Sequence, residues 1–293
     1  MRPSFSSRLI STILKWSKLK TQVEKRVNKP IKRSQKAFMP QAVAQAYQAH
    51  SQEVAGKTLA TFADKKQVSQ THVIFLHGGA YVFEAIGGHW DIAKKIVAQI
   101  HCRMTLIDYP LAPESTYKDA FAMLAEAYDL LGEQYPDDQF VLMGDSAGAG
   151  LALAFNQMLI KQNHPRLPVK TVLISPWLDL TMLNPEVDKF AKTDHLLTVN
   201  MLQSAGSLYA GGDDQTQYLL SPINGEFDDL PPTLVLYSNT ELFYPDCIKL
   251  KVLATAVNVN FQFKEYHKML HDWLVFPMPE RQEAIDDICA FLG

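Results

Sequence analysis

The stretch FVLMGDSAGAG, residues 140–150, decides how this chain folds. Its first four residues are apolar and predict a buried strand, and the helix formers at 151–160 predict a helix directly after it. Gly144 and Gly148 have no Cβ, so the strand and the helix can approach closely around Ser146, whose hydroxyl is pushed clear of the backbone. In this strand–turn–helix context the Gly-x-Ser-x-Gly sequence indicates a nucleophilic serine.

The rest of the chain alternates between strand patterns and helix patterns. Short apolar or β-branched runs predict strands at residues 59–62, 71–76, 104–109, 140–143, 169–175, 233–237 and 261–266. Helical spacing predicts helices at residues 41–50, 92–100, 120–131, 151–160, 201–209, 246–256 and 280–292. This alternation favours an α/β fold, a mainly parallel twisted sheet with helices on both faces.

The composition of the 293-residue chain is ordinary for a globular protein, with 47% hydrophobic and 20% charged residues. No stretch reaches the ~20 uninterrupted apolar residues of a membrane span. The cysteines Cys102, Cys247 and Cys289 have neither metal-site nor redox spacing, so we expect reduced, buried thiols and a cytoplasmic location. The sequence has no metal-binding cluster and no dinucleotide fingerprint, so no metal, cofactor or nucleic-acid partner is expected.

Charge is distributed unevenly along the chain. The net charge is −3, yet residues 1–40 carry eleven Lys or Arg against the single acid Glu24, which leaves the remainder at about −13. Apolar residues recur every three or four positions in this segment and predict one basic amphipathic helix, with Leu9, Ile13, Trp16, Leu19, Val23 and Val27 on its apolar side. Charged residues interrupt the pattern and no small-residue cleavage site follows, which argues against a secretory signal. Such a helix lies either on anionic lipid or on the acidic body of its own protein, and we expect the second arrangement.

Residues 182–230 interrupt the alternation with about fifty residues between two predicted strands, and an insertion of that length is usually functional. We expect this insertion to form a cap together with an N-terminal helical segment, residues 1–50. The main α/β domain is then predicted at residues 51–293.

A serine is a poor nucleophile at neutral pH unless an imidazole accepts its proton and a carboxylate orients that imidazole. In this architecture the order along the chain is serine, acid, histidine. His271, in the sequence MLHDW after the last predicted strand, is the predicted base. His267, which lies closer to that strand, is the alternative.

Two carboxylates compete for the role of the acid. Glu241 comes four residues after the predicted strand at 233–237, where its side chain can still hang over the carboxyl edge of the sheet. Asp246 is typical of the first turn of a helix, where the helix dipole alone favours an acid. Glu241 is therefore the predicted acid and Asp246 the alternative, while Asp179, which ends an earlier strand, is interpreted as structural.

The negative charge that develops on an attacked carbonyl oxygen needs fixed hydrogen-bond donors. The sequence HGGA, residues 77–80, follows a predicted strand, and Gly78 and Gly79 can turn their amides into a pocket because they have no side chains. Ala147 supplies a further amide, since it follows the nucleophile. The residues expected to contact substrate are Ala80, Tyr81, Asp145 and Trp177.

With these motifs in view, the chain resembles the hormone-sensitive-lipase group of α/β-hydrolases, the bacterial esterases with a His-Gly-Gly-Gly loop. The resemblance spans roughly residues 72–293 and rests on HGGA at 77–80, residues 109–114, GDSAG at 144–148, SPWLD at 175–179 and His271. It implies an α/β-hydrolase fold with a helical cap over the acyl site. It also implies a carboxylic-ester hydrolase with Ser146 as nucleophile, His271 as base and Glu241 as acid.

The chain departs from the pattern of that group at three positions. Ala80 replaces the third glycine, which keeps the amide but narrows the loop. Pro110 stands where the group usually has arginine, so whatever that side chain organises must be organised otherwise. Glu241 takes the place of the commoner aspartate, which keeps Asp246 in consideration. None of these changes removes a reacting group.

Together, the residues and the resemblance predict a serine carboxylesterase that hydrolyses small to medium acyl esters through an acyl-enzyme intermediate. An amidase or peptidase on the same triad is the alternative, because the fold and the triad do not choose the leaving group. A ligand-binding receptor on a hydrolase scaffold is less expected, because such proteins lose a triad member. The predicted partner is a small-molecule ester, and the sequence does not indicate an oligomeric state.

Overall fold

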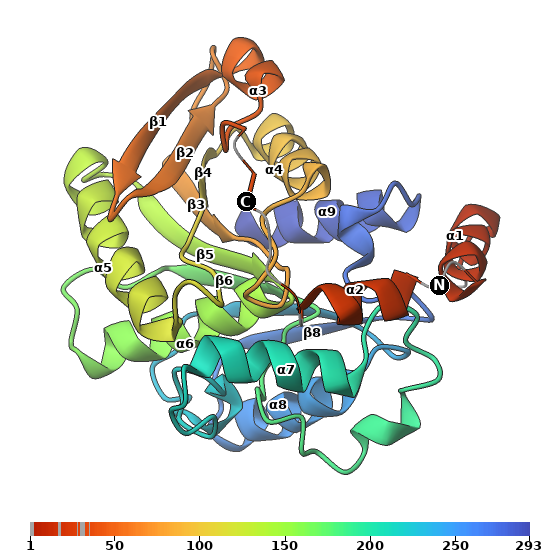
Figure 1. Cartoon of the computed structure of the whole chain (residues 1–293). Helices are drawn as coiled ribbons and strands as arrows, with labels where there is room; N and C mark the ends of the chain where they lie inside the picture. Colours follow the sequence, from red (N-terminus) through yellow and green to blue (C-terminus); the bar gives the residue numbers. More distant parts are fainter. Residues whose placement is uncertain (1–2, 17–18, 28, 30–32, 35) are drawn as a thin grey trace.

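A computed structural model describes residues 3–16, 19–27, 29, 33–34 and 36–293. Within these residues, eight strands form one twisted sheet in the order β1-β2-β4-β3-β5-β6-β7-β8 (Figure 1). The strands are β1 Gln48–Val54, β2 Lys57–Ala63, β3 Thr71–Leu76, β4 Arg103–Ile107, β5 Gln139–Asp145, β6 Lys170–Ile174, β7 Thr233–Ser238 and β8 Phe261–Tyr266. Strands β3 to β8 are parallel, whereas β1, β2 and β4 pair antiparallel at one side of the sheet.

Helices cover both faces of the sheet, with α4 and α9 on one face and α5, α6 and α8 on the other (Figure 1). The helices after β1 are α4 Gly87–Ile100, α5 Tyr117–Gln134, α6 Ala147–Lys161, α7 Val199–Ala210, α8 Tyr244–Ala256 and α9 Glu280–Leu292. Three short 3-10 helices, η1 Val187–Lys189, η2 Pro222–Asn224 and η3 Trp273–Val275, lie in the connections.

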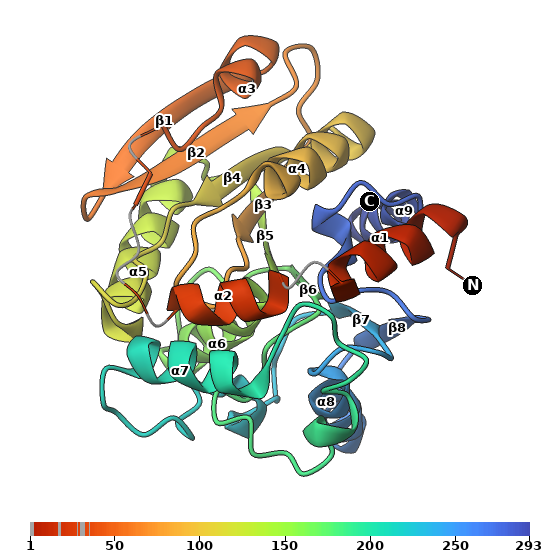
Figure 2. The same ribbon diagram turned by 45° about the vertical axis from the view of Figure 1, so that its right-hand side comes forward.

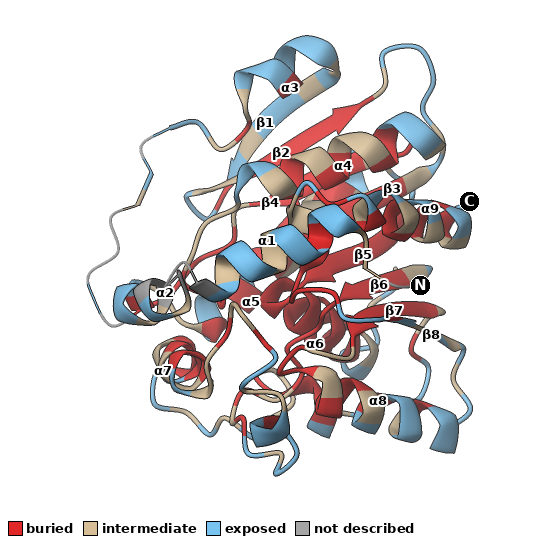
Figure 3. Ribbon diagram, turned by 90° about the vertical axis from the view of Figure 1, so that its right-hand side faces the viewer, coloured by how far each residue is buried: buried red, intermediate tan, exposed pale blue. Residues whose placement is uncertain are grey.

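The core consists of two apolar layers separated by the sheet. Along β3, Val73 and Phe75 belong to the layer beneath α4 and α9, and Ile74 and Leu76 belong to the layer beneath α5 and α6. Figure 3 shows the inner strands mostly buried, with exposed residues on the outer sides of the helices and in the loops. A strand covered on both faces is a continuous apolar run in sequence. The predicted α/β fold is confirmed, and each predicted strand overlaps an observed one.

The helix predicted at residues 41–50 is wrong in its second half. The helix α3, Gln41–Ala46, is one short piece, and β1 begins two residues after it. Strand β1 is mostly exposed and carries polar residues, so it has no apolar pattern to reveal it. A two-residue turn at Ala55 and Gly56, with φ of 49° and 72°, joins β1 to β2 as a hairpin.

The single amphipathic helix predicted for the N-terminal segment is also wrong. The structure has two helices, α1 Phe5–Trp16 and α2 Leu19–Val27, with residues 17–18 outside the described part. In α1, Ile10 and Leu14 pack against the core, whereas Leu9 and Ile13 are exposed. Val27 is buried, and the side chains of the other stripe residues, Trp16, Leu19 and Val23, lie outside the described part. None of the described helices is long and apolar enough to cross a membrane.

Both N-terminal helices contact the rest of the molecule. The amide of Ser4 and the hydroxyl of Ser7 donate to the carboxylate of Glu280 at the start of α9. Helix α2 lies beside α7 in both views (Figures 1 and 2). The Nζ of Lys20 donates to the carbonyls of Ala191 and Asp194 at 3.0 and 2.9 Å, within the insertion.

We expect Glu280→Ala to release α1, because the substitution removes the acceptor of the Ser4 and Ser7 bonds. Bonds to a charged group contribute about 1.5–3 kcal/mol. Limited proteolysis should therefore cut the first 30 residues faster, while the main domain stays intact. Glu133→Ala, an exposed acid on α5, is the control. Equal cleavage rates in both variants would show that Glu280 does not hold α1.

Candidate active site

Close backbone contact builds the turn between β5 and α6. A Cβ on Gly148 would lie 2.0 Å from the carbonyl oxygen of Leu76, and one on Gly144 would lie 2.3 Å from that of Gly148. Neither position can therefore carry a side chain. Ser146 stands between them with φ 52° and ψ −118°, a strained conformation for a residue with a Cβ. The turn places Ser146 at the carboxyl end of β5 and at the first turn of α6.

His271 bridges Ser146 and Glu241. Its Nε2 lies 2.9 Å from Ser146 Oγ, and its Nδ1 lies 2.8 Å from Glu241 Oε2. A carboxylate only accepts hydrogen bonds, so Nδ1 carries the proton and Nε2 is free to accept from the serine hydroxyl. All three residues are buried, with exposed fractions of 6%, 6% and 0% for Ser146, His271 and Glu241.

The ends of neighbouring parallel strands bring these side chains together. Glu241 follows β7, and the amide of Ser238 donates to its Oε1 at 2.8 Å. His271 follows β8 in a turn that is held by two hydroxyls, because Ser238 and Thr240 both donate to the carbonyl of Met269. The residues after β7 therefore fix both the carboxylate and the segment that carries the imidazole.

The alternative acid and base have other partners. Asp246 lies in the first turn of α8 as predicted, and its carboxylate accepts from Asn184 Nδ2 at 2.7 Å rather than from an imidazole. Burial raises the pKa of Asp246 to about 6. His267 Nδ1 lies 2.7 Å from Asn239 Nδ2 at the surface. Asp179 accepts from the amide and hydroxyl of Thr181, which agrees with its structural interpretation.

One predicted oxyanion donor needs correction. The amide of Gly78 donates to Asp145 Oδ2 at 2.9 Å, so it is not free to face a substrate. A Cβ on Gly78 would lie 2.2 Å from that same oxygen, which shows how closely the loop approaches β5. No described residue accepts from the amides of Gly79 or Ala147. Gly79 has φ 122°, a conformation that favours glycine.

Three of the residues expected to contact substrate have other partners within the protein. Tyr81 and Trp177 are 2% and 0% exposed and belong to a buried chain of aromatic rings, not to an open pocket wall. That chain runs from Tyr209 of α7 through Tyr81, Trp177 and Phe243 to His271, with successive ring centroids 3.8, 5.5, 5.9 and 5.1 Å apart. Asp145 binds Gly78 and His89, and substrate contact by Ala80 and its neighbours stays a prediction.

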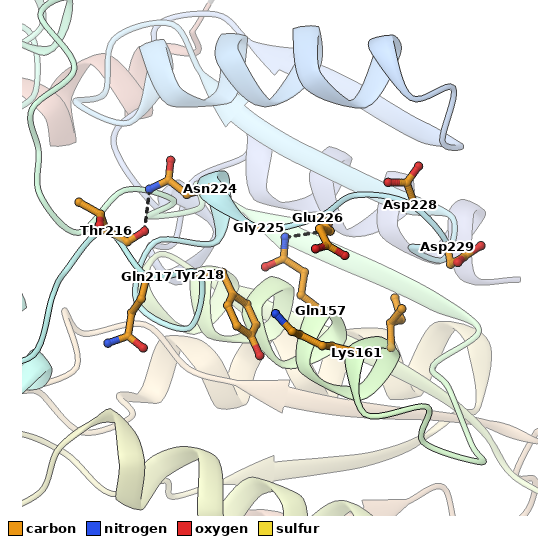
Figure 4. A pocket seen from close by; sticks show the side chains of 11 residues that line it. Gln157, Lys161, Thr216, Gln217, Tyr218, Asn224, Gly225, Glu226, Asp228 and Asp229 are labelled. Carbon is orange, nitrogen blue, oxygen red and sulfur yellow. Dashed lines mark hydrogen bonds between the residues drawn. The ribbon is translucent and has the colours of Figure 1, made fainter.

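An open pocket of about 310 Å³ lies at the other end of α6 (Figure 4). Gln157 and Lys161 of that helix line it together with Tyr218, and Gln157 Nε2 donates to the carbonyl of Glu226 at 3.1 Å. None of the residues predicted to be catalytic lines this pocket. We therefore do not assign ester hydrolysis to it.

Sequence reasoning missed two kinds of residue near the site. Arg33, in the N-terminal segment, donates to the carbonyls of Val82 and Ala112, both at 2.6 Å, and pairs with Glu114. The sequence signal that could have indicated Arg33 is Pro110, which stands where the related esterases usually have arginine. His89 and Asp272 lie beside Asp145 in the interior, and the position of Asp272 directly after the predicted base could have drawn attention to it. The three cysteines are free and buried, as predicted.

Comparison with known proteins agrees with this geometry. Residues 73–275 match the α/β-hydrolase fold family. An esterase of Acinetobacter venetianus is 32% identical over 78% of this chain and 76% of its own length, and an acetyl-hydrolase of Streptomyces hygroscopicus is 31% identical over 75% and 74%. The crystal structure of an esterase from the bacterial hormone-sensitive lipase family superposes with a TM-score of 0.80 and 27% identity, covering 95% of this chain and 97% of that one. The chain therefore belongs to the α/β-hydrolase family and is a carboxylic-ester hydrolase of the hormone-sensitive-lipase type.

Proposed function

We propose that Ser146 is the nucleophile, His271 the general base and Glu241 the acid that orients the base. The observation that carries this proposal is the bridge from Ser146 Oγ through His271 to Glu241, at 2.9 and 2.8 Å. As the serine oxygen attacks the ester carbonyl, Nε2 accepts its proton and Glu241 stabilises the imidazolium. The same proton then goes to the leaving alcohol, which leaves an acyl group on Ser146. A water molecule, activated by His271, hydrolyses that acyl-enzyme.

The amides of Gly79 and Ala147 are the proposed donors to the oxyanion. Ala147 begins α6, so its amide is one of the first-turn N–H groups that have no intrahelical acceptor. The positive end of the helix dipole adds to the stabilisation of the developing charge. The amide of Gly78 serves instead to hold the loop against Asp145.

Small to medium acyl esters are the proposed substrates. One relative is named acetyl-hydrolase and another esterase, which supports a short acyl group and an ester over an amide. The amidase or peptidase alternative is not favoured by these relatives. Retention of all three triad residues argues against a receptor without activity.

The N-terminal segment, residues 1–50, and the insertion at about 182–230 are the proposed cap. Support comes from α2, which lies beside α7, and from Tyr209 of α7, whose ring stacks on Tyr81. Arg33 ties the same segment to the carbonyl of Val82, just after the oxyanion loop. These contacts also favour docking of the N-terminal segment over a membrane role. A cytoplasmic location is the further proposal, supported by three unpaired thiols, and no nucleic-acid partner is proposed.

Ser146→Ala should abolish the release of nitrophenol from nitrophenyl acetate and butyrate. We expect turnover to fall by at least about 10⁴-fold, because the acyl-enzyme cannot form. Circular dichroism should match that of the wild type, since the hydroxyl makes no packing contact that alanine loses. Turnover retained by this variant would rule out Ser146 as nucleophile.

Glu241→Gln and Asp246→Asn separate the two candidate acids. We expect Glu241→Gln to lower kcat by about 10²–10⁴-fold, because the amide no longer holds the imidazolium. Asp246→Asn should change kcat by less than about threefold, since its carboxylate bonds to Asn184 and not to the imidazole. The larger loss at Asp246 would reverse the assignment.

Arg33→Ala tests the cap. The guanidinium binds two carbonyls and a carboxylate, and losing these bonds should detach the segment from the loop that follows Gly79. We expect kcat/KM for the butyrate ester to fall roughly 10-fold. Lys36→Ala, an exposed residue of the same segment, is the matched control. An unchanged kcat/KM in Arg33→Ala would exclude the segment from the site.

A further inference from the structure

A buried pair of carboxyl groups lies beside the triad and takes no part in the steps above. Asp145 precedes the nucleophile and Asp272 follows the base, and their exposed fractions are 0% and 8%. One oxygen of Asp145 and one of Asp272 lie within 4.8 Å of each other, and the Oδ1 atoms of both residues have no hydrogen-bond partner among the described residues. Two buried carboxylates this close repel each other, and because a carboxylate only accepts hydrogen bonds, a bond between them requires a proton on one of the two.

The surrounding donors decide which carboxyl group is ionised. Asp145 Oδ2 accepts from the amide of Gly78 at 2.9 Å and faces His89 Nε2 at 3.2 Å. Asp272 has no such donors within the described residues, and its Oδ1 is buried without one. Donors stabilise the charged form of an acid, and burial without them stabilises the neutral form. The proton therefore belongs on Asp272.

His89 does not compensate a second negative charge. Its Nδ1 accepts the amide N–H of Ile86 at 2.9 Å, so the imidazole proton is on Nε2 and points toward Asp145. An imidazole that accepts at one nitrogen and donates at the other is neutral. This tautomer also argues against a metal ion, although His89, Asp145 and Asp272 offer ligand atoms within 4.8 Å of one another. The nitrogen that would coordinate a metal carries the proton.

The other titratable groups that face the pair bring no compensating charge. Burial lowers the pKa of His77 to about 4, so it is neutral at pH 7. Burial holds the pKa of Tyr109 well above its usual value, so this side chain is also neutral. The charge of Glu241 repels a charge on Asp272. Burial first and the charge of Asp145 second raise the pKa of Asp272 well above the usual range.

We propose that Asp272 is a positioning residue that stays protonated at neutral pH and donates to Asp145. This bond ties the turn that carries His271 to the turn that carries Ser146. Through the amide of Gly78, the same Asp145 carboxylate holds the oxyanion loop. The proton on Asp272 thus links the turn at Ser146, the turn at His271 and the oxyanion loop at residues 77–80. The proposal rests on the proposed roles of Ser146 and His271 for its effect on turnover, but not for its effect on stability.

The pH dependence of folding stability tests directly whether Asp272 is protonated in the folded protein. An aspartate titrates near pH 4 in the unfolded chain. Because the pKa of Asp272 is higher in the folded protein, the folded wild type binds one more proton than the unfolded chain above pH 4. This difference lowers the folding constant of the wild type about tenfold for each pH unit. Asp272→Asn does not titrate. Its folding constant relative to the wild type, from urea unfolding, should rise roughly 100-fold between pH 5 and 7. Asp228→Asn, an exposed control, should follow the wild type.

Parallel curves for Asp272→Asn and the wild type would overturn the proposal, because they would mean that Asp272 is ionised in the folded state. This result does not depend on catalysis. Turnover by Ser146→Ala would instead overturn the proposed function and leave the stability curves as they are.

The kinetics of two variants distinguish the effect of the hydrogen bond that Asp272 donates from the effect of its packing. Asp272→Asn keeps an N–H donor to Asp145, so kcat at pH 7 should stay within about threefold of the wild type. Asp272→Ala removes the donor, and kcat should fall roughly 10–100-fold with KM nearly unchanged. Equal kcat values for the two variants would contradict the proposal. If the alanine variant does not fold, the stability curve of Asp272→Asn decides: a curve parallel to that of the wild type contradicts the proposal.

Discussion

The close approach of β5 and α6 at Gly144 and Gly148 is the constraint on which the rest of the site depends. A side chain at either glycine would meet backbone atoms within 2.3 Å, so the turn can form only with these residues. The approach forces Ser146 into a conformation with φ 52°, which costs about 1–3 kcal/mol for a residue with a Cβ. In return, the hydroxyl stands at the end of the sheet, within hydrogen-bond distance of an imidazole supplied by a strand three positions away in the same sheet.

Placing the site at the carboxyl edge of parallel strands also places charged groups in a dry environment. Glu241 is fully buried and its two oxygens are bound by the Ser238 amide and the His271 imidazole. Asp145 is equally buried, and its ionised form depends on donors from the oxyanion loop and from α4. The charges of Glu241 and Asp145 must therefore be compensated by hydrogen-bond donors within the site. This requirement links the chemistry of the site to the stability of the fold.

The proximity of the three predicted triad residues follows from chain order and from the parallel strands. Ser146, Glu241 and His271 come after β5, β7 and β8, which are parallel and therefore end at the same edge of the sheet. Residues whose position depends on a neighbour across the fold could not be predicted. The amide of Gly78 turns away from the expected pocket because the Asp145 carboxylate, 67 residues later, accepts from it.

The ends of the chain were harder to predict for the same reason. Strand β1 is polar and exposed, so only its hairpin with β2 defines it. In α1 the side chains that pack on the core are Ile10 and Leu14 and not the predicted Leu9 and Ile13, because contacts with the rest of the fold decide which side of the helix is buried. Arg33 reaches the carbonyls of Val82 and Ala112 from a segment whose sequence gives no sign of that contact.

Covalent trapping with a fluorophosphonate identifies the nucleophile. The protein would be treated with a fluorophosphonate that carries a short alkyl chain, and the adduct would be located by peptide mass spectrometry while activity is followed in parallel. We expect one adduct, on the peptide that contains Ser146, formed at the rate at which esterase activity is lost and absent from Ser146→Ala. An adduct on another residue, or complete inactivation with Ser146 unmodified, would contradict the proposal that Ser146 is the nucleophile.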